Sequence, residues 1–123
     1  MVKRDNIFKT GNSNDLPFSF NGEVTEVFED MIDRSVPGYK SSLKLIENIG
    51  KSYFQDNSSC YDLGCSLGAS TLSLLKATKK KEGKIYAIDN SKDMISSCKL
   101  KFKNSIDFNK VEFINQDLET IQI

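Results

Sequence analysis

Histidine is absent from this chain of 123 residues, and its charge is balanced, with 17 lysines and arginines against 17 aspartates and glutamates. The absence of histidine removes the commonest neutral-pH general base and the commonest metal ligand from consideration. Nucleic-acid-binding modules usually carry a basic excess, which a balanced chain does not have. We therefore expect no metal site and no direct contact with nucleic acid.

Cysteines are few, and long apolar runs are missing. The three cysteines, Cys60, Cys65 and Cys98, do not have the spacing of a zinc site, and their odd number argues against a disulfide framework. No stretch approaches the roughly 18 apolar residues of a membrane span, and the polar N-terminus does not resemble a signal peptide. We expect reduced thiols, no membrane association and a cytoplasmic protein.

The chain begins with an irregular segment, which two helical patterns follow. Residues 1–22 show neither a helical nor a strand period, which predicts an irregular N-terminal arm. A disordered tail is the alternative for these residues. Over 23–35 the apolar residues keep helical spacing, and this helix should end before Pro37. A second helix is predicted over 39–54.

The remaining residues alternate between strand and helix patterns. Parallel strands joined by right-handed helical crossovers are the default for such alternation, which predicts an α/β fold with strand order 3-2-1. In the first crossover helix we expect Ala69, Leu72 and Leu75 to face inward. The length allows one domain, 23–123, after the arm. The predicted strands are 59–63, 84–88 and 110–115, and the predicted helices between them are 68–80 and a helix from about 91.

Three strands in this order leave the first strand with an unpaired edge. In a complete doubly wound sheet the first strand is central, whereas a bare edge exposes backbone groups and invites aggregation. We therefore expect a truncated chain or a fragment of a longer reading frame.

The turn after the first strand, from Asp62 to Gly68, is the clearest sign of a ligand site, because ligands of α/β sheets bind beyond the carboxyl ends of the strands. A dinucleotide fingerprint G-x-G-x-x-G fails at Ser66 and Ala69, where glycines are required. S-adenosylmethionine (SAM) has no pyrophosphate, so the looser D-x-G-x-x-x-G pattern suits it. An ordinary tight turn between strand and helix is the alternative.

Acidic residues follow the next two strands. Asp89 can accept hydrogen bonds from a ribose diol, and Asn90 can donate or accept beside an adenine. Asp117 can accept from the adenine amino group, with the backbone of Leu118 beside it. A helix-capping turn is the alternative for Asp89 and Asn90, and a surface acid is the alternative for Asp117. Three strand ends together favour SAM.

Three segments resemble the carboxy-S-adenosyl-L-methionine synthase family, formerly described as a tRNA cmo5U methyltransferase. They are V-F-E-D-M-I-D-R-S-V-P-G-Y at 27–39, Y-D-L-G-C-S-L-G-A at 61–69 and A-I-D-N-S at 87–91. The S-V-P-G-Y portion is more specific than the turn, which many methyltransferases approximate. The resemblance spans essentially the whole chain and implies the first half of a Rossmann-like class I SAM-methyltransferase fold.

The resemblance also implies an activity and a set of ligand contacts. The family converts SAM and prephenate to carboxy-SAM and phenylpyruvate. A partner enzyme then uses carboxy-SAM to modify a wobble uridine in tRNA. The resemblance implies a homodimer as well. The residues implied to bind SAM or carboxy-SAM are Tyr39, Gly64, Cys65, Ser66, Asp89, Asn90, Asp117 and Leu118.

No catalytic residue follows from the sequence. Arg34 is a candidate cation for a substrate carboxylate, although an arginine at a helix end or on the surface is an equal alternative. Further substrate-binding residues of the family lie in its second half, so 123 residues alone could be inactive. An ordinary SAM-dependent methyltransferase and a truncated, non-catalytic SAM-binding remnant remain alternatives.

Overall fold

The computed structural model describes residues 31–32, 34–104 and 108–123. The predicted arm lies outside these residues, as does most of the predicted helix over 23–35. Residues 31, 32, 34 and 35 of that helix are described and are helical.

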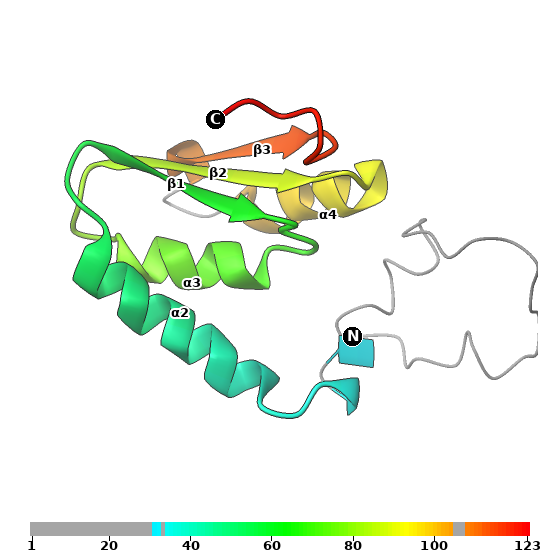
Figure 1. Ribbon diagram of the computed structural model, residues 1–123, viewed down its shortest axis with the longest axis horizontal. Helices are drawn as coiled ribbons and strands as arrows, with labels where there is room; N and C mark the ends of the chain where they lie inside the picture. The colour runs from blue at the N-terminus through cyan, green and yellow to red at the C-terminus, as the bar shows by residue number, and fades with distance from the viewer. Residues whose placement is uncertain (1–30, 33, 105–107) are drawn as a thin grey trace, which may run out of the picture.

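The described residues form one sheet of three parallel strands in the order β1-β2-β3, which confirms the predicted order (Figure 1). Leu63 pairs with Ile88, and Ile88 pairs with Ile114, so the carboxyl ends of the three strands lie at one edge. The strands are β1 (Ser58–Leu63), β2 (Gly83–Asp89) and β3 (Val111–Asn115).

Helices cover one face of this sheet. Helices α3 and α4 pack against the strands, and α2 packs on α3 (Figure 1). No helix in the described ranges is long and apolar enough to cross a membrane. The helices are α2 (Tyr39–Tyr53), α3 (Ala69–Ala77), α4 (Lys92–Phe102) and a 3₁₀ turn at Phe108–Lys110.

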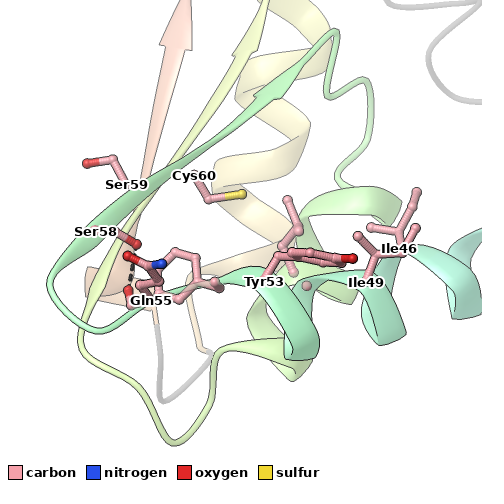
Figure 2. Close-up of a pocket in the computed structure, with 10 residues that line it drawn as sticks. Ile46, Ile49, Tyr53, Gln55, Ser58, Ser59 and Cys60 are labelled. Carbon is pink, nitrogen blue, oxygen red and sulfur yellow. Dashed lines mark hydrogen bonds between the residues drawn. The ribbon is translucent and has the colours of Figure 1, made fainter.

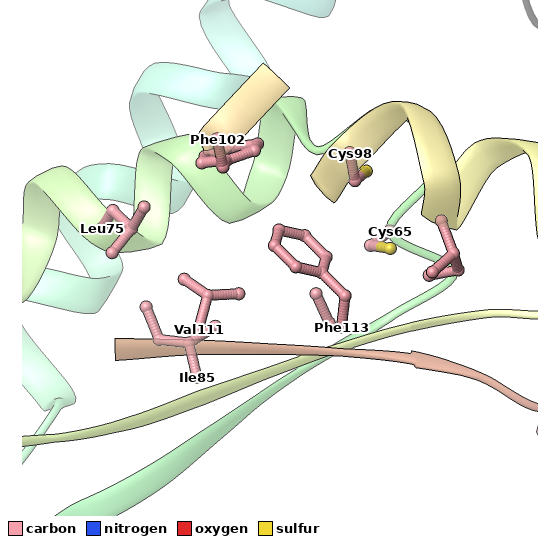
Figure 3. Packing of buried hydrophobic residues seen from close by; sticks show 9 residues of the cluster. Cys65, Leu75, Ile85, Cys98, Phe102, Val111 and Phe113 are labelled. Atoms are coloured by element: carbon pink, nitrogen blue, oxygen red, sulfur yellow. The ribbon is translucent and has the colours of Figure 1, made fainter. Parts of the chain in front are cut away.

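The core lies between the sheet and helices α3 and α4 (Figure 3). One prediction for α3 was wrong, because Leu72 is 38% exposed whereas its neighbour Thr71 is fully buried. The hydroxyl of Thr71 donates to Asp62 at 2.7 Å, and this contact turns Thr71 rather than Leu72 toward the sheet. The buried core residues are Cys65, Leu75, Ile85, Ala87, Ile95, Cys98, Phe102, Val111 and Phe113.

No described helix packs on the other face of the sheet, although Ile88 of β2 is buried there (Figure 1). Tyr61 on β1 stacks on Tyr86 of β2 with ring centroids 5.1 Å apart. Leu63 at the end of β1 is 52% exposed. Residues 116–122 approach this face from beyond β3 and share a hollow with the two tyrosines.

Candidate functional site

The turn between β1 and α3 is tightly built and has a left-handed backbone at three positions. Gly64, Ser66 and Gly68 have φ of 77°, 51° and 87°. The amides of Gly64 and Cys65 both donate to the carbonyl oxygen of Ile88 at 2.8 Å, which fastens the start of the turn to β2. The amide of Gly68 donates to the carbonyl of Cys65 at 2.8 Å and closes the turn at the start of α3.

A cavity of about 230 Å³ lies beside this turn. Tyr39, the first residue of α2, reaches the same cavity, so the structure brings it together with three other predicted ligand residues. A Cβ built on Gly64 meets no atom within 4 Å, which leaves room for a ligand there. The lining residues are Ile32, Tyr39, Gly64, Cys65, Ser66, Leu67, Ala69 and Ser70.

Asp89 stands at the carboxyl end of β2 and ties two elements together. It is only 8% exposed. One carboxylate oxygen accepts from the amide of Ser66 at 3.0 Å, and the other accepts from the amide of Ser91 at 2.9 Å. Each carboxylate oxygen has a second lone pair. The predicted ribose contact therefore has to use those remaining lone pairs, and it stays a prediction.

The cap of helix α4 is Ser91, and Asn90 is exposed beside it. The hydroxyl oxygen of Ser91 accepts from the amide of Met94 at 3.2 Å, while Asp93 lies in the first turn, where an anion is favoured. Since Ser91 caps the helix, the side chain of Asn90 is not needed for that task.

Asp117 and Leu118 follow β3, and the structure does not bring them into the cavity beside Tyr39. Both are exposed. The carboxylate of Asp117 accepts from the amide of Glu119 at 2.9 Å, and its carbonyl accepts from the amide of Thr120 at 3.1 Å. Their contacts are thus local, and an adenine contact remains a prediction.

Asp62 lies under the turn and has an unusual environment. Burial raises the pKa of its carboxyl, and the negative charge of Asp89 raises it further, whereas the hydrogen bond from Thr71 lowers it. Sequence reasoning assigned no role to Thr71. The sequence does carry a signal for the bond between Thr71 and Asp62, because a hydroxyl residue lies in the first turn of the helix that follows an aspartate at a strand end.

The cysteines of the site are thiols without disulfides. A hydrogen bond with Cys98 raises the pKa of Cys65 well above its usual range, and burial adds to this. The thiol of Cys98 donates to the carbonyl oxygen of Ser66 at 2.9 Å. A buried thiol with a raised pKa stays protonated at neutral pH, so it serves as a donor and not as a nucleophile.

A larger hollow of about 490 Å³ lies between α2, α3 and β1 (Figure 2). Among the described residues that line it there is no carboxylate and no cationic side chain. Among the residues that the structure describes, no three His, Cys, Asp or Glu side chains gather as a metal site. The residues lining the hollow are Ile46, Ile49, Gly50, Tyr53, Phe54, Gln55, Ser58, Ser59, Cys60 and Leu74.

The chain matches a known protein family and is similar to curated proteins. A family model described as a methyltransferase domain matches residues 61–123. The carboxy-S-adenosyl-L-methionine synthase of Vibrio atlanticus (strain LGP32) is 40% identical over 123 residues, 100% of this chain and 51% of that protein. The synthase of the same name from Idiomarina loihiensis is 45% identical over 127 residues, again covering 100% and 51%. The chain spans about half the length of these curated relatives.

Solved structures share the fold at low sequence identity. A putative S-adenosyl-L-methionine-dependent methyltransferase from Methanococcus maripaludis matches with a TM-score of 0.66 and 17% identity, covering 91% of this chain and 49% of that one. Magnesium protoporphyrin IX methyltransferase from Synechocystis PCC 6803, solved with bound SAH, matches with a TM-score of 0.54 and 19% identity, covering 69% and 38%. These likenesses show the fold alone and confirm the predicted class.

Proposed function

The chain belongs to the methyltransferase domain family, and from that premise we propose that it is the SAM-binding part of a carboxy-SAM synthase. The observation that carries this proposal is the cavity that joins Tyr39 to the glycine turn from a distant part of the chain. The relatives that share its sequence over the full 123 residues bear this enzyme's name.

The cavity fits one end of SAM. Ligand pockets usually measure roughly 300–1,000 Å³, and at about 230 Å³ this cavity is smaller. We assign it to the methionine end. An aromatic ring attracts a nearby cation, so Tyr39 is a favourable neighbour for the sulfonium. The open space beside Gly64 lets the ligand approach the backbone closely.

The rest of the ligand would follow the carboxyl edge of the sheet. The turn after β1, Asp89 at the end of β2 and Asp117 after β3 follow one another along one edge of the sheet. The free lone pairs of Asp89 suit a ribose diol, and Asn90 lies exposed beside it. Asp117 and Leu118 would meet the adenine. This order of methionine, ribose and adenine repeats the order of the strands.

The remaining features of the activity come from the family resemblance. Prephenate would be the second substrate and phenylpyruvate the second product, with carboxy-SAM passing to an enzyme that modifies tRNA. Arg34 is the candidate cation for a substrate carboxylate. We also propose a cytoplasmic homodimer that contacts neither nucleic acid nor membrane directly. An ordinary SAM-dependent methyltransferase is the second candidate, which the general methyltransferase domain match favours.

Native mass spectrometry of the purified chain tests the proposal. The chain is incubated with SAM and prephenate, and bound ligand is then released under denaturing conditions. A species heavier than SAM by one carboxyl group is the expected result. Release of unchanged SAM would indicate that the chain binds SAM without catalysis. Methyl transfer to an acceptor in the absence of prephenate would favour the second candidate. A chain that retains no ligand would contradict the proposal.

A matched pair of variants on one helix sharpens this test. Tyr39 and Tyr53 are the first and last residues of α2. Tyr39 lines the proposed ligand cavity, whereas Tyr53 lines the larger apolar hollow. Tyr39→Ala should lower SAM retention roughly ten-fold or more, as expected for loss of an aromatic and cation–π contact. Tyr53→Ala should leave retention unchanged.

A further inference from the structure

The peptide of Ser66 is held from both sides in an unfavourable conformation. Its φ of 51° lies in the left-handed region, which is unfavourable for a residue other than glycine. Its amide donates to Asp89 at 3.0 Å, and its carbonyl oxygen accepts from the thiol of Cys98 at 2.9 Å. Such a conformation persists where the surroundings determine it. The two bonds come from β2 and α4, both distant in sequence.

Cys98 is well placed to fix this peptide. It is 0% exposed and lies on α4 in the core cluster, next to Cys65 of the turn (Figure 3). Its Sγ also lies 3.4 Å from the position that a Cβ would take on Gly68, at the far end of the turn. Cys98 thus contacts the turn at its middle and at its end.

We infer that Cys98 is a positioning residue for the proposed ligand site, since its thiol holds the Ser66 carbonyl and thereby fixes the part of the cavity wall that the glycine turn forms. The expected effect of Cys98 on SAM binding rests on the proposed function. Its expected effect on the conformation of the turn does not. The thiol of Cys65 lies beside the same group, with its Sγ 3.8 Å from the Ser66 carbonyl oxygen.

The thiol of Cys65, beside Cys98, agrees with this role. The pKa of Cys65 is raised by its hydrogen bond with Cys98 and by burial, which keeps that thiol protonated. A thiol is a weak donor, so the expected effect of losing the Cys98 thiol is that of one hydrogen bond. Hydrogen bonds of this kind change an equilibrium by about three- to ten-fold.

Amide hydrogen exchange of the full chain, measured by NMR, tests the inference without any ligand. Cys98→Ala removes the donor, and Cys98→Ser keeps a donor of smaller size. Exchange at the Ser66 amide is compared with exchange at Ala87, which is fully buried in β2 and reports global opening. Cys60→Ala is the matched control, because Cys60 packs against the same core without touching the turn.

The inference predicts that Cys98→Ala accelerates exchange at Ser66 about three- to ten-fold, while exchange at Ala87 changes far less. Cys98→Ser should restore most of the protection, and Cys60→Ala should leave the ratio of the two rates unchanged. Equal effects of the alanine and serine variants would overturn the inference, because Cys98 would then act through packing. Parallel acceleration at Ser66 and Ala87 would overturn it as well.

A SAM titration of the same variants separates this inference from the proposed function. The dissociation constant should rise in Cys98→Ala by a factor similar to the change in exchange at Ser66. A parent chain that binds no SAM would overturn the proposed function, whereas exchange at Ser66 would still decide the role of Cys98.

Discussion

The turn after β1 and the turn after β3 lie at the same edge of the sheet, but they are held in different ways. The first is fastened by β2 through Ile88 and Asp89 and by α4 through Cys98. Among the described residues, the second is bonded to β2 only at its start, where the amide of Gln116 donates to the carbonyl oxygen of Asp89 at 3.1 Å, and the hydrogen bonds of Asp117 reach no farther than Thr120. Other elements therefore hold the first turn along its length before any ligand arrives, whereas beyond Gln116 the second turn depends on local contacts.

This difference bears on how the proposed site is divided. A preformed turn binds a ligand without the cost of ordering the turn. The described residues should therefore already bind the methionine end of SAM. Exposed residues such as Asp117 and Leu118 gain a fixed environment only when something packs on them. Variants in the first turn should therefore affect stability and binding together, and variants in the second should spare stability.

The largest expected effect belongs to Gly68→Ala. The new Cβ would lie 2.6 Å from Cε2 of Phe102, whose buried ring has no room to move, and the φ of 87° disfavours any side chain. We expect the free energy of unfolding to fall by about 2–4 kcal/mol. Urea denaturation followed by circular dichroism measures the change.

Gly64→Ala is the matched control for Gly68→Ala. Its φ of 77° is similarly left-handed, but a Cβ there meets no atom within 4 Å. Only the conformational cost remains, about 1 kcal/mol. Equal losses in the two variants would show that α4 does not pack against the first turn as described.

A smaller change in the free energy of unfolding should distinguish Asp89, which bonds to the first turn, from Asp117 in the second. Asp89→Asn keeps one acceptor oxygen and loses the other, which leaves one of two backbone amides without its partner. We expect a loss of about 1–2 kcal/mol of stability. Asp117→Asn should change stability by less than about 0.5 kcal/mol, because Asp117 is exposed. Urea denaturation of both variants decides this, and equal losses would contradict the contrast between the turns.

The smallest effect is a pH dependence from Asp62. Burial raises its folded-state pKa above the ordinary value of 3.8. Its contribution to stability is therefore complete below that pH and is lost as the pH rises through the folded-state value. Asp62→Asn keeps an acceptor for Thr71 and cannot ionise, so it should gain stability relative to the parent as the pH rises above 3.8. Parallel pH profiles of parent and variant would refute this assignment.

Much of the fold could be predicted from the sequence because it depends on local patterns. Short apolar runs alternating with helical spacing predicted the three strands and their order. The start of α4 was predicted near residue 91, but only the structure shows that Ser91 is its cap. The prediction for Leu72 was wrong because an apolar residue was preferred over Thr71 as the buried position. The hydrogen bond that Thr71 donates to Asp62 joins two different elements, so the pattern of α3 alone does not show it.

The candidate site divides in the same way. Turn chemistry and family resemblance pointed to Tyr39 and the glycine turn, and the cavity unites them. The positions of Asp117 and Leu118 outside that cavity could not be predicted, because no local signal specifies how a strand end turns. The contact of Cys98 with Ser66 was also invisible, since it links residues from two helical crossovers that only packing brings together.

The most direct test of the account is a titration of the ¹⁵N-labelled chain with SAM, followed by NMR. The account predicts saturable shifts at Tyr39, Gly64 and Ser66 that exceed those at Leu118, because the first turn is preformed and Leu118 is not held. No saturable shift, or shifts confined to Ile49 and Tyr53 in the apolar hollow, would contradict it.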